Sequence, residues 1–252
     1  MNRKIIVALV VLVAILAIGK YLQTDAVTPL PKVEKPQPQS APQPLVREAP
    51  VAASDNAAPV EQVPLPALAE SDAGVREAAG ELAQKLLAWL TPAEQIRKWV
   101  VAVDLAADGE LVGKNRPLAY PVAPFKVIGS GDDLRADAAN FDRTTELVDT
   151  LTSIPPVRAA AVYRSWRPLF EEAYRELGKG GSFDAQLRQA LARVLAVKPL
   201  DAAPALVQPQ VFYRYADPQL EKASDIDKLL WRMGPDNSAK LQAWLTQVRA
   251  AL

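Results

Sequence analysis

The 252-residue chain contains no cysteine and no histidine. Without cysteine it can form no disulfide, no thiolate metal site and no lipid attachment through a thiol. Without histidine it lacks the commonest general base and the commonest transition-metal ligand, which excludes Ser-His-Asp and Cys-His catalysis and histidine-containing zinc sites. Any catalysis would depend on carboxylate, lysine, tyrosine or serine side chains, and we expect no cofactor and no bound metal.

Neither sign of charge predominates, because the chain has 29 lysine and arginine residues and 29 aspartate and glutamate residues. Residues 70–252 alone carry 23 basic and 24 acidic side chains. Domains that bind nucleic acid usually show a clear excess of basic side chains on one face. We therefore expect no nucleic-acid partner.

One long apolar run, Ile5–Gly19, lies near the N-terminus and contains no charged or hydrogen-bonding side chain. As a helix this run would be roughly 22 Å long, and flanking residues up to Leu22 extend it toward the ~30 Å hydrocarbon core of a bilayer. Because Arg3 and Lys4 precede the run, the positive-inside rule keeps the N-terminus in the cytoplasm. Residues 1–23 are therefore predicted to form a single-pass anchor in the inner membrane, with the C-terminal part of the chain in the periplasm.

The same run has a second interpretation as a cleaved signal peptide, since Ala17-Ile18-Gly19 roughly fits a small-x-small cleavage pattern. The apolar residues continue right up to that point, however, and Lys20 would follow the cut. We favour the uncleaved anchor on these grounds. Both interpretations place the remaining residues outside the cytoplasm.

Residues 24–70 contain ten prolines, no glycine and no aromatic residue. Such a segment buries too little apolar surface to offset the entropy lost on ordering, and proline biases it toward the extended polyproline II conformation. We expect a disordered, semi-rigid linker that holds a domain away from the membrane. The alternative is that Pro-Gln-Pro stretches dock into an aromatic groove.

Residues 71–252 are expected to form one mainly helical domain, because apolar side chains recur every three to four residues along most of this segment. The predicted helices cover residues 72–90, 91 to about 107, 141–153, 156–177, 183–197, 219–233 and 236–251. For the helix over 156–177 the predicted apolar face is Tyr163, Trp166, Phe170, Ala173 and Leu177.

Local signals predict where these helices begin and end. The expected N-caps are Ser71 or Asp72, Asn140, Ser182 and Asp217, and Thr91-Pro92-Ala93-Glu94 has the pattern of a capping box. Gly178 is the expected C-cap of the helix over 156–177. Pro168 lies inside that helix and is expected to kink it.

Two segments do not fit a helical pattern. Prolines exclude a helix over residues 113–139, where residues 125–128 followed by Gly129-Ser130-Gly131-Asp132 predict a short strand, a turn and a small hairpin. The glycine-rich turn lacks the spacing of a nucleophile elbow and the lysine of a P-loop. Residues 211–215 alternate in polarity and are expected to form a lone extended segment. The predicted fold is therefore a helical bundle with a small β-hairpin or extended insertion.

Three stretches of this domain resemble a family of bacterial envelope proteins, the domain-of-unknown-function family numbered 3014. They are residues 168–178 (PLFEEAYRELG), Tyr213 with residues 217–221 (DPQLE), and residues 228–237 (KLLWRMGPDN). The resemblance covers residues 71–252 and implies one C-terminal domain behind an N-terminal membrane segment and a proline-rich stretch. It implies an envelope location but no activity, so no catalytic residue follows from it.

Five carboxylates offer an alternative acidic site: Glu171, Glu172, Glu176, Asp217 and Glu221. A pair of carboxylates can cleave a glycosidic bond without histidine or metal, and envelope glycan would be the natural substrate for such a hydrolase or lyase. Residues four apart on a helix more often form a solvated face, however, and an aspartate before a proline more often caps a helix. We therefore expect no catalytic residues, and the glycan enzyme is the alternative hypothesis.

Aromatic and arginine side chains provide the expected partner-binding set, because these residue types dominate interface energetics. The set consists of Tyr213, Tyr215, Trp231 and Arg232. With no recognisable catalytic group, the sequence predicts a non-enzymatic, membrane-tethered binding or scaffold domain. Its expected partner is another envelope protein or the cell-wall polymer.

Overall fold

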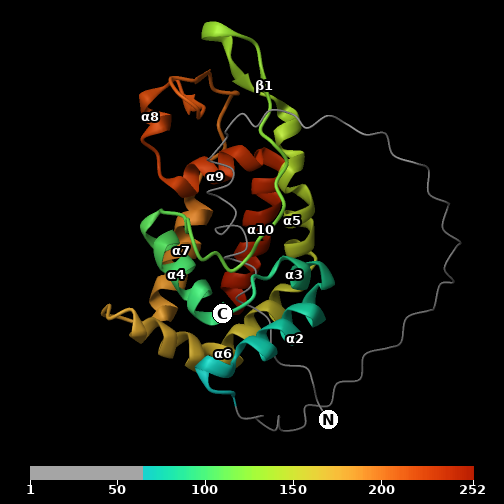
Figure 1. Ribbon diagram of the computed structural model, residues 1–252, viewed down its shortest axis with the longest axis vertical. Helices are drawn as coiled ribbons and strands as arrows, with labels where there is room; N and C mark the ends of the chain where they lie inside the picture. The colour runs from blue at the N-terminus through green and yellow to red at the C-terminus, as the bar shows by residue number, and fades with distance from the viewer. Residues whose placement is uncertain (1–64) are drawn as a thin grey trace, which may run out of the picture. The chain divides into compact units, whose positions relative to one another are not determined.

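The computed structural model describes residues 65–252 (Figure 1). The predicted membrane segment and most of the predicted linker lie outside these residues. The described end of the linker contains a short 3-10 helix, η1 (Leu68–Glu70), in which Leu68 is buried, so the folded part begins slightly before residue 71. No helix within residues 65–252 has both the length and the apolar run needed to span a membrane.

The described region is mainly helical, as the sequence predicts, and it carries two small antiparallel hairpins. The helices are α2 (Asp72–Leu82), α3 (Gln84–Trp89), α4 (Gln95–Asp108), α5 (Asp142–Thr152), α6 (Pro156–Glu176), α7 (Phe183–Ala196), α8 (Pro218–Glu221), α9 (Asp225–Met233) and α10 (Pro235–Ala251). The strands are β1 (Val127–Ile128), β2 (Arg135–Ala136), β3 (Leu206–Val207) and β4 (Arg214–Tyr215), with 3-10 helices at η2 (Gly131–Asp133) and η3 (Ala138–Asn140).

The core lies among α4, α6, α7 and α10, where α4 packs on α6 and α7, and α10 packs on α5, α6 and α7. Aromatic rings fill the α6–α7 contact, and Phe170 stacks on Phe183 with 5.3 Å between ring centroids. The predicted apolar face of α6 is confirmed at Tyr163, Trp166, Phe170 and Ala173. Leu177 is exposed instead, because it follows the last helical residue, and Gly178 then turns the chain away with a φ of +69°.

Two predicted N-caps are confirmed. Ser182 Oγ accepts a hydrogen bond from the backbone N–H of Ala185 at 3.2 Å at the start of α7. Asp217 Oδ1 accepts from the N–H of Gln219 at 2.7 Å at the start of α8. In both cases the cap and its donor are close in sequence, which is why the sequence alone was sufficient to predict them.

The single helix predicted over 72–90 is wrong, because the chain breaks at Ala83 with extended dihedrals (φ −159°, ψ 116°). Gly80, a weak helix former, lies just before the break. After the break α3 buries Leu86 and Trp89.

The capping box predicted at Thr91–Glu94 is also wrong. The backbone N–H groups of Glu94 and Gln95 donate instead to the carboxylate of Asp72, both at 2.8 Å. Thr91 Oγ1 donates to the backbone oxygen of Arg116 at 2.8 Å and caps nothing. A long-range acceptor at the start of α2 thus replaces the local cap of α4.

Asn140 does not cap α5, which Phe141 precedes. Its side chain instead binds both backbone groups of Lys126, accepting from the N–H at 2.9 Å and donating to the oxygen at 2.6 Å. The helix predicted over 219–233 is divided into α8 and α9, because Ser224 Oγ accepts from the N–H of Asp227 and begins a new helix. In each case a polar side chain has a backbone partner that the local pattern did not indicate.

The predicted hairpin is confirmed, since β1 pairs antiparallel with β2. Gly129 begins the turn with a φ of +80°, and a Cβ there would lie 2.2 Å from the backbone oxygen of Asp133. The lone extended segment predicted over 211–215 is wrong, because Arg214–Tyr215 pairs with Leu206–Val207 as a second hairpin. Both hairpins lie at the same end of the domain (Figure 1).

Candidate interaction surface

Three of the four predicted partner-binding residues come together where the second hairpin meets α9. The rings of Tyr215 and Trp231 meet edge to face with centroids 5.9 Å apart, and the guanidinium carbon of Arg232 lies 5.7 Å from the centre of the Tyr215 ring. Tyr213 packs elsewhere, against Phe125 two residues before β1, with ring centroids 5.8 Å apart.

These contacts hold the second hairpin on the body of the domain. Tyr215 is buried, while Trp231 and Arg232 are half-buried. The indole N–H of Trp231 donates to the backbone oxygen of Lys198 at 2.9 Å. Tyr215, Trp231 and Arg232 therefore lie on the packed side of the hairpin layer, and the solvent-facing side consists of other residues.

Strand register defines that solvent-facing side. Ile128 pairs with Arg135 on the first hairpin, and Val207 pairs with Arg214 on the second. Directly opposed residues of an antiparallel pair project from the same side, as do residues two apart on one strand. The isolated bridge between Arg135 and Ala205 links the two hairpins in one layer. The residues that share this side by register are Ile128, Arg135, Ala205, Val207 and Arg214. We call these five residues, together with the exposed residues Val211 and Phe212 of the β3–β4 loop, the hairpin face.

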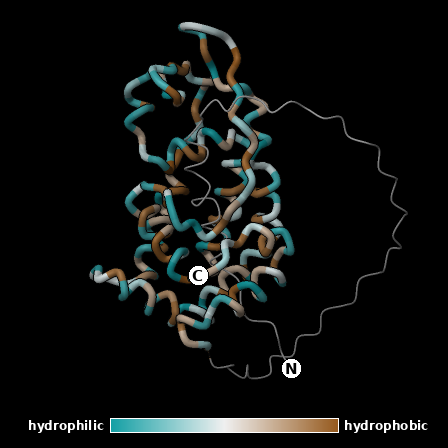
Figure 2. The backbone as a smooth tube through the Cα atoms, in the orientation of Figure 1, coloured by the Kyte–Doolittle hydropathy of each residue, from teal (hydrophilic) through white to brown (hydrophobic). Residues whose placement is uncertain are grey.

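Exposed apolar side chains concentrate here. Of the six large hydrophobic residues that are exposed within residues 65–252, four lie on the two hairpins, and the relative exposures are 53% for Ile128, 42% for Val207, 57% for Val211 and 45% for Phe212. Figure 2 shows hydrophobic stretches along both hairpins. The other two, Val157 and Leu177, lie at opposite ends of α6. Several exposed apolar residues at one end of a fold are typical of a binding surface, whereas single exposed apolar residues are ordinary.

The hairpin face also carries charge of both signs at its margin. Arg135 donates from Nε to Asp133 at 3.1 Å and from Nη1 to the backbone oxygen of Ala203 at 2.8 Å. Arg214 of β4 and Asp132 of the β1–β2 turn are both exposed. Within residues 65–252, neither side chain forms a hydrogen bond or an ion pair. Arg214 and Asp132 thus remain available to a partner.

Glu221, predicted as part of an acidic site, closes the open edge of β4. Its Oε2 accepts a hydrogen bond from the backbone N–H of Tyr215 at 3.0 Å, and Lys228 Nζ lies 3.9 Å from Oε1. A free strand edge invites pairing with another chain, and a charged side chain across it prevents this. The carboxylate therefore disfavours the addition of another strand at this edge.

Three more of the predicted acidic residues have structural contacts. The two carboxylate oxygens of Glu171 accept from the N–H groups of Phe183 and Asp184 at 2.9 and 3.1 Å, at the start of α7. Glu176 accepts from Arg97 Nε at 2.6 Å, a contact that lowers the pKa of Glu176 and raises that of Arg97. Asp217 caps α8, as described above.

Glu172 is exposed, and residues 65–252 contain no cluster of three acidic side chains arranged to hold a metal ion. The glycan hydrolase or lyase remains a hypothesis from the sequence, in which carboxylates act without a metal.

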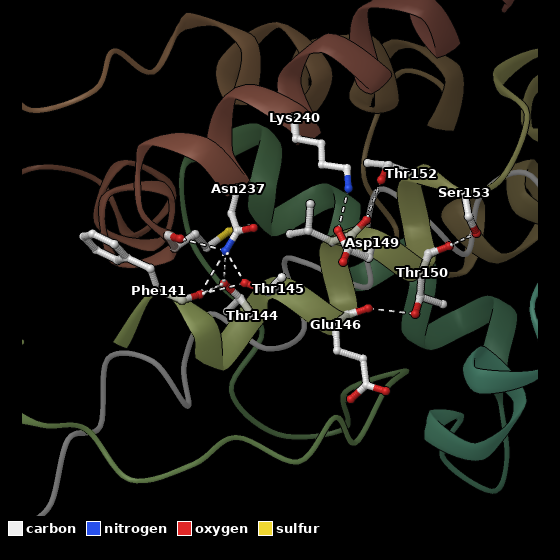
Figure 3. Close-up of polar contacts among 12 residues, drawn as sticks. Phe141, Thr144, Thr145, Glu146, Asp149, Thr150, Thr152, Ser153, Asn237 and Lys240 are labelled. Carbon is white, nitrogen blue, oxygen red and sulfur yellow. Dashed lines mark hydrogen bonds and ion pairs between the residues drawn. The ribbon is translucent and has the colours of Figure 1, made fainter. Parts of the chain in front are cut away.

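The motif over residues 228–237 builds the turn between α9 and α10. Gly234 has a φ of +84°, and its backbone lies against the Phe141 ring, where a Cβ would come within 2.4 Å of Cγ. Asn237 donates to the backbone oxygens of Phe141 at 2.9 Å and Met233 at 3.1 Å (Figure 3). Lys240, one turn later, reaches Asp149 of α5. This motif therefore joins the turn between α9 and α10 to α5.

The described region is thus a helical domain with an exposed apolar and charged face on paired hairpins. A family model described as "Protein of unknown function (DUF3014)" matches residues 95–249, and the chain belongs to this family. The match includes both hairpins and the helices from α4 to α10, apart from the last two residues of α10. No curated protein and no solved structure matches the chain.

Proposed function

We propose that this protein is a non-enzymatic, membrane-tethered periplasmic domain that holds another envelope protein at its hairpin face. The observation that carries the proposal is the concentration of exposed apolar side chains on this face, with arginine beside them. Interface centres are enriched in aromatic and arginine residues, and burial of apolar surface is the main favourable term in association. The tether and the location follow from the apolar N-terminal run and the proline-rich segment.

The cell-wall polymer is the alternative partner within the same role. A glycan presents mostly hydroxyl and amide groups, which require hydrogen-bonding side chains, whereas Ile128 and Val207 offer none. The composition of the hairpin face therefore favours a protein. Co-sedimentation of the full chain with purified cell-wall polymer tests this preference: binding that persists in a Phe212→Asp variant would assign the polymer to a different surface.

Crosslinking in intact bacterial cells tests the protein partner. The full chain carries a photo-reactive amino acid at position 212 on the hairpin face, and a control chain carries it at position 157, where Val157 is 68% exposed on α6. We expect position 212 to capture an envelope protein that position 157 does not capture. Equal capture at both positions, or none at position 212, would contradict the proposal. A reporter enzyme fused after Leu252 separately tests the location.

A further inference from the structure

We draw no further inference here: the strongest candidate, the exposed apolar hairpin face on the two paired hairpins, belongs to the surface already described, and nothing among the described residues shows what covers it.

Discussion

Asn237 at the start of α10 donates a hydrogen bond from its side-chain amide to the backbone oxygen of Phe141 at 2.9 Å, and this bond ties α10 to the start of α5 (Figure 3). The same amide also donates to the backbone oxygen of Met233 at 3.1 Å. Asn237 is buried, so Asn237→Ala would remove the hydrogen bonds of this amide to both carbonyl groups in a place with little water. We expect a loss of about 1–3 kcal/mol in the free energy of unfolding.

Urea unfolding of the full chain, followed by the fluorescence of its five tryptophans, measures this loss. Lys240→Ala is the matched control, because Lys240 joins the same two helices through an exposed ion pair with Asp149 at 2.5 Å. An exposed pair contributes at most about 1 kcal/mol. An equal loss in the free energy of unfolding for both variants would show that burial does not strengthen the Asn237 contact.

Gly234 is the residue of the α9–α10 turn at which we expect substitution to be least tolerated. Its φ of +84° disfavours any residue with a Cβ, and in Gly234→Ala that Cβ would lie 2.4 Å from Cγ of Phe141. We expect the substitution to lower the free energy of unfolding by at least about 2 kcal/mol, because the ring must move out of a packed position.

Gly180→Ala is the control for this prediction, since Gly180 does not have a positive φ and no atom lies within 4 Å of the added Cβ. Its stability should stay within about 0.5 kcal/mol of the parent chain. Denaturant midpoints of the two variants provide the comparison, and a stable Gly234→Ala variant would show that the Phe141 ring relocates without cost.

The sequence predicted most of the helices because their signals are local. The apolar face of α6 repeats every three to four residues, and Ser182 lies next to the helix that it caps. The failures at Thr91 and Asn140 share one physical cause, which is a partner distant in the chain. Asp72 caps α4 across 22 residues, and no local pattern indicates that this carboxylate would displace Thr91.

The candidate surface was predicted only in part, for the same reason. Aromatic composition identified Tyr215 and Trp231, which the structure brings together but on the packed side of the hairpin layer. Ile128 and Val207 were missed, because their common face depends on the bridge between Arg135 and Ala205, 70 residues apart. The exposed Val211-Phe212 pair within a polar loop was the one local signal that would have located the face.

Glu171 is expected to stabilise the fold through α7. Its two oxygens accept from the N–H groups of Phe183 and Asp184, which have no partner within the helix. Glu171→Ala should therefore lower the free energy of unfolding by about 1–2 kcal/mol, as the loss of an N-cap does. Glu171→Gln keeps one carboxamide oxygen as an acceptor and should lose less.

The neighbouring Glu172→Ala variant is the control, since Glu172 is exposed on the same helix. Chemical denaturation should show a change within about 0.5 kcal/mol for this variant. If the Glu171→Ala variant were as stable as the parent chain, Glu171 would have no role in stabilising α7. Glu171 would then again be a candidate catalytic acid under the glycan enzyme hypothesis.

Acid should destabilise the protein through Asp184. Burial alone would raise the pKa of this carboxyl group, but hydrogen bonds from Arg188 and Tyr163, both at 3.0 Å, outweigh burial and lower the pKa below its ordinary value of 3.8. A carboxyl group with a lowered pKa in the folded state contributes stability above its ordinary pKa, and this contribution is lost as the pH falls toward the lowered value. The free energy of unfolding should therefore decrease between about pH 4 and pH 2.

Denaturant unfolding at a series of pH values checks the assignment. Asp184→Asn cannot titrate, so its stability should change less over this interval than that of the parent chain. Tyr163→Phe removes one of the two donors, which should raise the pKa of Asp184 and move the loss of stability to higher pH. If the Asp184→Asn variant and the parent lost stability equally on acidification, other carboxylates would account for the acid sensitivity, and the contact between Tyr163 and Asp184 would make no pH-dependent contribution to the fold.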